Sequence, residues 1–204
     1  MTRWKKWELA LLLGLCAAFM WGAWSAQRQD ALAQKMIRLH VIANSDSQRD
    51  QTLKLAVRDQ VLDYATGVLQ RSADMKDARR RLENSLDRIE DIARQTLLAQ
   101  GCDVSVTAQL TETEFPLKEY DGFSLPAGEY TALRLVIGEG RGQNWWCVVY
   151  PPLCTAAAAQ LPETAVQGGM TEDDLRLITE EDAGYVLRFR SLELWERLRQ
   201  WLGK

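Results

Sequence analysis

Hydrophobic residues form one long run near the start of the chain and shorter periodic patterns after it. The run occupies residues 9–24 and follows a short basic head, residues 1–6. A basic head, an apolar stretch and small residues at its exit are typical of a secretory signal. Ala23-Trp24-Ser25 fits the small-residue rule for cleavage after the serine. The pattern therefore predicts export across the cytoplasmic membrane.

The same segment also fits an anchor that is retained. Residues 7–26 provide about the 20 positions that a bilayer-spanning helix needs. Tryptophans flank the run near both ends, where interfacial aromatic residues are expected. Cleavage and retention stay open, and both give the same division of the chain. Residues 1–26 are a signal peptide or signal anchor, and residues 27–204 form one exported domain.

Periodic patterns after this segment predict an α+β domain. Residues 36–43 are β-branched and partly alternating, which predicts a strand. Ser47 and Asp50 resemble a capping box, so a helix should begin there. Its buried face is expected from apolar residues spaced three or four apart: Leu53, Val57, Val61, Ala65 and Val68. A second helix is expected over residues 74–100 and should end at Gly101, a glycine in the C′ position.

The second half of the chain is predicted to be mostly strands. Strands are expected at residues 103–111, 130–137, 145–150 and 185–190, and helices at residues 171–181 and from Ser191 onward. Residues 112–128 carry prolines and glycines and are interpreted as a loop. Residues 138–144 are interpreted as a glycine-rich hairpin connection rather than a phosphate loop, because a strand follows them instead of a helix. The order predicts helices packed on a mixed, mostly antiparallel sheet.

Charge and cysteine content narrow the function. The net charge is −3, and basic residues are not gathered into a patch, which argues against a nucleic-acid partner. The chain has one histidine and four cysteines, without the close cysteine pair of a zinc site. Cys16 lies in the apolar run, which leaves Cys102, Cys147 and Cys154 in the exported part. No metal or cofactor is expected.

Cys147 and the single histidine, His40, are a candidate catalytic pair. A thiol nucleophile needs a thiolate and a base in contact with it. Both residues lie inside expected strands, where ordinary packing explains them equally well. An extracytoplasmic cysteine hydrolase that acts on the envelope is therefore kept as the alternative function. Cys147 and Cys154 form either a disulfide, which an oxidising compartment permits, or two buried free thiols.

Two further features suggest contact with a partner. Trp145 and Trp146 should point to opposite faces of a strand. One is then expected in the core, and the other is expected to be exposed, as binding anchors often are. The turn at residues 44–47 is explained by helix capping or by the binding of a cation or a partner.

Three blocks of sequence are similar to one known family. The first is Ile37-Arg38-Leu39-His40-Val41-Ile42-Ala43-Asn44-Ser45-Asp46-Ser47, followed by Asp50-Gln51, Leu53-Lys54-Leu55 and Val57-Arg58-Asp59. The second is Leu125-Pro126-Ala127-Gly128-Glu129-Tyr130, then Ala132-Leu133-Arg134, Ile137-Gly138, Gly140, Gly142, Asn144 to Cys147, and Pro151 to Cys154. The third is residues 186–202, with Leu194-Trp195-Glu196. These blocks resemble the stage II sporulation protein R family. The segment from Thr155 to Gln160 departs from it, because the family more often has an aromatic or apolar residue after the second cysteine.

The resemblance implies an exported signalling protein of endospore-forming bacteria rather than an enzyme. Such a protein is made in the forespore and secreted into the space between the forespore and mother-cell membranes. There it triggers a membrane-embedded receptor protease, stage II sporulation protein GA, which processes pro-sigma-E in the mother cell. The expected contact residues are Asn144, Trp145 and Trp146, with a second candidate patch at His40, Asn44 and Asp46.

Overall fold

A four-stranded sheet forms the centre of the protein in the computed structural model, which describes residues 3–154 and 160–179. The strand order is β2-β5-β1-β6. Strand β1 (Ile37–Ile42) is parallel to β5 (Gly128–Ile137) and antiparallel to β6 (Asn144–Tyr150). Strand β2 (Val106–Phe115) pairs with β5 in the antiparallel direction. The predicted α+β class, with its mixed and mostly antiparallel sheet, is confirmed.

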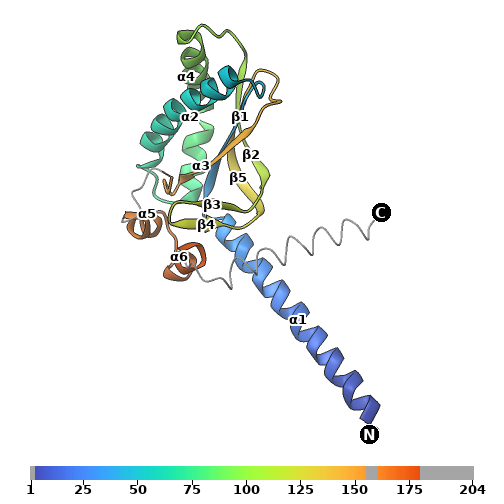
Figure 1. Cartoon of the computed structure of the whole chain (residues 1–204). Helices are drawn as coiled ribbons and strands as arrows, with labels where there is room; N and C mark the ends of the chain where they lie inside the picture. The colour runs from blue at the N-terminus through green and yellow to red at the C-terminus, as the bar shows by residue number, and fades with distance from the viewer. Residues whose placement is uncertain (1–2, 155–159, 180–204) are drawn as a thin grey trace.

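Three helices cover one face of this sheet (Figure 1). They are α2 (Gln48–Leu69), α3 (Met75–Glu83) and α4 (Leu86–Ala99). Ser47 caps α2 as predicted, because its side chain accepts a hydrogen bond from the Asp50 amide at 3.1 Å. The predicted apolar stripe is buried except at its end, where Leu69 rather than Val68 enters the core.

The single helix predicted over residues 74–100 is wrong, because the chain breaks it into α3 and α4 at Asn84 and Ser85. The Ser85 hydroxyl donates to the Arg81 carbonyl at 2.8 Å. Serine and asparagine compete in this way with the helical hydrogen bonds of the backbone. The predicted end at Gly101 is confirmed by its φ of +69° and by the bond from the Cys102 amide to the Leu97 carbonyl.

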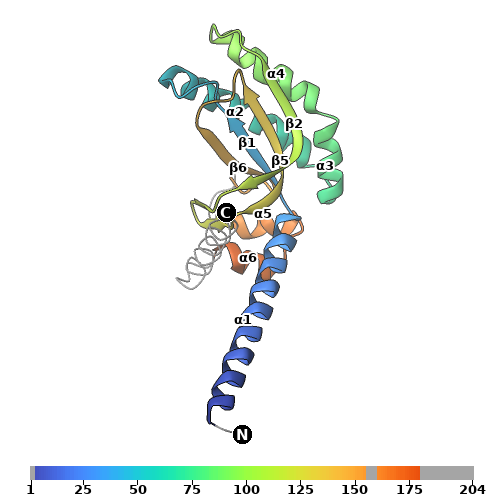
Figure 2. The ribbon, with the colours of Figure 1, turned by 90° about the vertical axis from the view of Figure 1, so that its right-hand side faces the viewer.

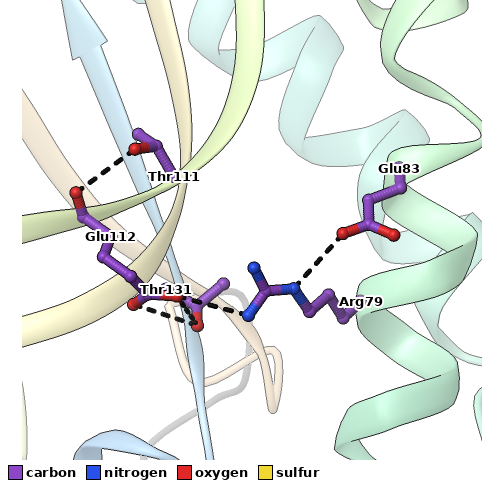
Figure 3. A network of polar contacts seen from close by, with 5 residues as sticks. All are labelled: Arg79, Glu83, Thr111, Glu112 and Thr131. Atoms are coloured by element: carbon purple, nitrogen blue, oxygen red, sulfur yellow. Dashed lines mark hydrogen bonds and ion pairs between the residues drawn. The ribbon is translucent and has the colours of Figure 1, made fainter.

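A polar network ties α3 to β2 and β5 (Figure 3). Arg79 on α3 donates to Glu112 on β2 and to Glu83 on its own helix, each at 3.2 Å. Glu112 also accepts from the Thr131 hydroxyl on β5 at 3.0 Å. Arg79 and Glu112 are each about half exposed, so solvent screening limits this ion pair to about 1 kcal/mol or less.

The segment predicted as a loop at residues 112–128 is largely structured. Strand β2 continues to Phe115, and β3 (Lys118–Tyr120) pairs with β4 (Phe123–Leu125) in a two-stranded sheet. Asp121 and Gly122 form the turn between them, and Gly122 has a φ of +82°. An Asp-Gly pair between alternating residues is a strong hairpin signal.

A second apolar cluster lies at the end of the sheet where β1 begins. It joins the β3–β4 hairpin to α5 (Leu161–Gln167) and α6 (Glu172–Thr179). Lys35 forms an ion pair with Asp174 at 2.5 Å, which ties the segment before β1 to α6. The helix predicted over residues 171–181 is confirmed as α6 within the described residues. The strand predicted at 185–190 and the helix predicted from Ser191 lie outside them.

Helix α1 (Arg3–Ala33) projects away from the rest of the protein (Figure 2). It continues through residue 26, the boundary expected from the sequence, and its last residues Leu32 and Ala33 are buried in the second cluster. Several side chains on its outer part are exposed and apolar, including Leu11, Phe19 and Trp21. Across the residues described, hydropathy identifies no helix long and apolar enough to span a membrane.

Candidate functional site

The glycine-rich segment after β5 is not a hairpin connection, contrary to the prediction. Strands β5 and β6 lie on either side of β1, so residues 138–143 must pass over the end of β1. Gly138 and Gly140 have φ values of +57° and +62°, which confirms the expected use of glycine at positive φ. The segment therefore reaches β6 by wrapping around the turn at residues 44–47.

Hydrogen bonds fasten the glycine-rich segment to that turn. The Asn44 side chain accepts from the Glu139 amide at 3.0 Å and donates to Asp50 at 2.9 Å. The Asp46 carboxylate accepts from the Gln143 amide at 2.7 Å. Asn44 and Asp46 thus join the turn at residues 44–47 to the glycine-rich segment. These internal hydrogen bonds explain the presence of both polar side chains.

His40 lies on the face of the sheet away from α2, under an aromatic cluster. Its ring stacks on Trp146 with centroids 3.8 Å apart, and Phe115 meets Trp146 edge-on at 4.6 Å. The His40 Nε2 atom lies 3.0 Å from the Asn144 side-chain oxygen. His40 is 6% exposed. This residue of the second candidate patch therefore packs against the Trp146 side chain of β6.

Stability should depend on pH through His40, because burial lowers its pKa below 6.5. The bond to Asn144 opposes this shift, and Arg134 and Arg38 add to it. As the pH falls below 6.5, the His40 side chain becomes protonated in the unfolded chain but stays neutral in the folded chain. The free energy of unfolding should then fall by up to about 1.4 kcal/mol per pH unit, until the pH reaches the folded-state pKa.

Chemical denaturation of the full chain between about pH 7 and pH 5 measures this dependence, a window set by the ordinary histidine pKa. The sequence has one histidine, so His40→Gln should remove the slope near pH 6. An equal slope in the wild type and the variant would show that another group causes it.

Trp145 and Trp146 point to opposite faces of β6, as predicted. In the register with β1, Trp146 lies opposite His40 and Trp145 lies opposite Val41. Trp146 is half-buried in the aromatic cluster, whereas Trp145 is 38% exposed. The Arg58 guanidinium lies 4.2 Å from the centre of the Trp145 ring and holds it in place by a cation–π contact.

An open pocket of about 450 Å³ lies beside β6. Both tryptophans line it, together with Asn144 and with polar side chains from α2 and β3 that include Lys54 and Lys118. Lys54 is 4% exposed and donates to the Gln143 carbonyl at 3.0 Å. The pocket joins two tryptophans to charged side chains of both signs, because Glu119 lines it beside the two lysines. Aromatic residues are enriched in protein interfaces, which makes this edge a candidate contact surface.

Arg38 is fully buried on the same face as His40. It donates to the Tyr120 hydroxyl at 2.7 Å, and its guanidinium lies over Phe115 and Tyr130 at 3.9 and 4.7 Å. Burial raises the pKa of Tyr120 to about 12, so this phenol is neutral. Arg38 makes no ion pair with a carboxylate anywhere in residues 3–154 and 160–179.

The cysteine–histidine pair considered from the sequence is wrong for this geometry. Cys147 lies opposite Leu39 in the sheet, and His40 lies opposite Trp146. Neighbouring residues of a strand point to opposite faces, so Cys147 faces the helices and His40 faces away from them. The hydrogen bond with Cys154 and burial also raise the pKa of Cys147, which disfavours the thiolate. Cys147 and Cys154 are free thiols in the structure.

Several residues around the pocket escaped the sequence analysis. Lys54 was expected only within a helix, and Lys118 and Tyr120 lay in the presumed loop. Lys54 lies between Leu53 and Leu55 on an otherwise apolar part of α2, which could have marked it. The Asp121-Gly122 pair could have revealed the hairpin that carries Lys118 and Tyr120.

The similarity to known proteins spans the part of the chain that contains the sheet and this pocket. A family model described as stage II sporulation protein R matches residues 33–160. The protein of that name from Bacillus subtilis strain 168 is 39% identical over 123 residues, which are 60% of this chain and 55% of that protein. The chain thus aligns with little more than half the length of this relative. No solved structure matches the chain.

Proposed function

Because this chain belongs to the stage II sporulation protein R family, we propose that it is an exported signal that activates a receptor protease. The protease is the membrane-embedded stage II sporulation protein GA, and the outcome is processing of pro-sigma-E in the mother cell. Residues 1–26, with their basic head and apolar run, direct export into the space between the forespore and mother-cell membranes. Residues 27–204 form the signalling domain.

The exposed Trp145 beside the pocket is the observation that carries this proposal. Arg58 holds its ring in one position, so binding costs less side-chain entropy than it would for a free tryptophan. Asn144 is also exposed and lies at the same edge. A ligand activates a receptor only by binding its active state more tightly than its inactive state. Contacts of Trp145 and Asn144 with the receptor provide this difference in affinity. Trp146 and His40 hold the strand that carries these two residues in position.

The proposal is tested in a vegetative host that makes the receptor protease and pro-sigma-E. We expect processing to appear when the full chain is added and to disappear when residues 1–26 are deleted. Processing without the chain, or its absence while the folded domain is present outside the cytoplasm, would contradict the proposal.

Trp145→Ala should abolish most of the processing in this host, because a central tryptophan anchor is commonly worth about 2 kcal/mol or more of binding free energy. Leu98→Ala is the matched control, since Leu98 is a 43% exposed apolar residue on α4, away from the pocket. We expect it to process pro-sigma-E like the wild type. Equal activity of the two variants would place the contact elsewhere.

A further inference from the structure

Two thiols of unequal character meet at the end of β6. Cys147 is 3% exposed and Cys154 is half-buried. Both sulfur atoms contact the backbone of Val148: the Cys147 thiol donates to its carbonyl at 3.8 Å, and its amide donates to the Cys154 sulfur at 3.0 Å. The interaction between the two thiols raises the pKa of Cys147 and lowers the pKa of Cys154. The structure thus places a buried thiol that favours its protonated form beside a half-buried thiol of lowered pKa.

The surroundings of Cys154 favour its thiolate. The Val148 amide donates to the Cys154 sulfur at 3.0 Å. Burial alone would raise the pKa of a thiol, but the bonds from Cys147 and Val148 and the charge of Arg38 outweigh it here. Hydrogen-bond donors and a nearby cation are the features that mark reactive cysteines.

The buried Arg38 gives this arrangement a second, independent sign. Its Nε and Nη1 atoms have no hydrogen-bond partner among the described residues, although the side chain is fully buried. A buried guanidinium is costly without a compensating negative charge. The aromatic rings on its faces and the neutral Tyr120 do not supply one. The charge of Arg38 lowers the pKa of Cys154, so the thiolate form of Cys154 would bring a negative charge into the surroundings of this guanidinium.

We propose that Cys154 is a redox-active thiolate that exchanges with disulfides and that Cys147 resolves the product into an internal disulfide. The Cys154 sulfur attacks one sulfur of the incoming disulfide, and the other sulfur leaves as a thiolate. Cys147 then loses its proton and attacks the Cys154 sulfur of the mixed disulfide, which releases the second thiolate. Starting from the Cys154 thiolate and the Cys147 thiol, the two cysteines lose two electrons and one proton. The incoming disulfide becomes two thiolates, one of which takes up that proton.

The internal disulfide would close the chain between β6 and the turn at residues 151–153. Trp145 and Trp146 lie just before Cys147 on the same strand, so oxidation would restrain the end of the strand that carries the contact surface. The proposed export would place this oxidation outside the cytoplasm, so that location rests on the proposed function. The thiol chemistry itself does not depend on export, and a purified chain tests it separately from signalling.

The test uses the reduced full chain in detergent, a graded series of reduced and oxidised glutathione at pH 7, and peptide mass spectrometry after alkylation. The wild type should form the Cys147–Cys154 link, and Cys147→Ala should instead accumulate glutathione on Cys154. Cys154→Ala should leave Cys147 unmodified, and Cys102→Ala should match the wild type. Absence of the link across the series, or a glutathione adduct on Cys147 in Cys154→Ala, would overturn the proposal.

The role of Arg38 is tested by the rate of Cys154 modification in the Cys147→Ala background. Arg38→Met should slow it at pH 7, because the charge of Arg38 lowers the pKa of Cys154, and Arg38→Lys should slow it less. If Arg38→Met fails to fold, the pH profile of iodoacetamide labelling of wild-type Cys154 decides. A midpoint below the ordinary thiol value of about 8.5 supports the proposal, and a midpoint at or above that value overturns it.

Discussion

Trp146→Ala is expected to lower the free energy of unfolding by about 3–5 kcal/mol, the usual cost of truncating a packed tryptophan. The indole stacks on His40 at 3.8 Å and meets Phe115 at 4.6 Å. Its removal takes both ring contacts away from this face of the sheet and exposes the buried imidazole. Denaturant unfolding of the full chain, followed by circular dichroism, measures the loss.

Trp145→Ala is the matched control for this loss, because it removes the same side chain from the next position. Trp145 is partly exposed and its main contact is the Arg58 guanidinium, so we expect a cost nearer 1 kcal/mol. Similar losses for the two variants would mean that both rings are part of the core. That result would contradict the assignment of Trp145 as the exposed anchor.

Gly142→Ala is expected to cost about 3 kcal/mol, at the upper end of the range for overpacking a tight site. A Cβ atom at Gly142 would lie 2.3 Å from the Ser45 carbonyl oxygen and 2.8 Å from the Ala43 Cβ. The Gly142 amide also donates to the Ala43 carbonyl at 2.9 Å. The backbone must therefore shift at the junction that joins the glycine-rich segment to the end of β1.

Gly67→Ala provides a control of opposite sign. Gly67 lies inside α2, and a Cβ atom there would meet nothing within 4 Å. Alanine is favoured over glycine in a helix interior, so this variant should be more stable by about 0.5–1 kcal/mol. The same unfolding experiment compares both variants. A Gly142→Ala protein as stable as the wild type would refute the close approach.

The sequence predicted the elements whose signals are local. The alternation around His40 predicted β1, and Ser47 with Asp50 predicted the start of α2. Gly101 predicted the end of α4. Each of these signals reports only on the few residues around it, so the fold elsewhere does not alter it. The break at Asn84 and Ser85 was missed because the apolar stripe continues on both sides of it.

The order of the strands could not be read from the sequence. Strands β5 and β6 are neighbours along the chain, and only a six-residue glycine-rich segment, residues 138–143, separates them. A hairpin was therefore the natural interpretation, yet β1 lies between them. Strand β1 (Ile37–Ile42) lies 90 or more residues earlier in the chain. No local pattern shows that so distant a strand is placed between β5 and β6.

The candidate site was predicted in part. The opposite directions of Trp145 and Trp146 followed from strand geometry, and the register with β1 confirms them. The charged side of the pocket was missed, because Lys54 reaches it through long-range contact with Gln143. The buried Arg38, which has no carboxylate partner within residues 3–154 and 160–179, was missed for the same reason. Burial of its charge appears only once the hairpin and the sheet are assembled.

Direct binding of the purified full chain to the purified receptor protease in detergent tests the central claim. We expect saturable binding that Trp145→Ala weakens by about thirtyfold or more, which corresponds to the roughly 2 kcal/mol of a strong interface anchor. Leu98→Ala should bind like the wild type. Absence of binding by the folded wild-type chain, or equal affinities of the wild type and Trp145→Ala, would contradict the account.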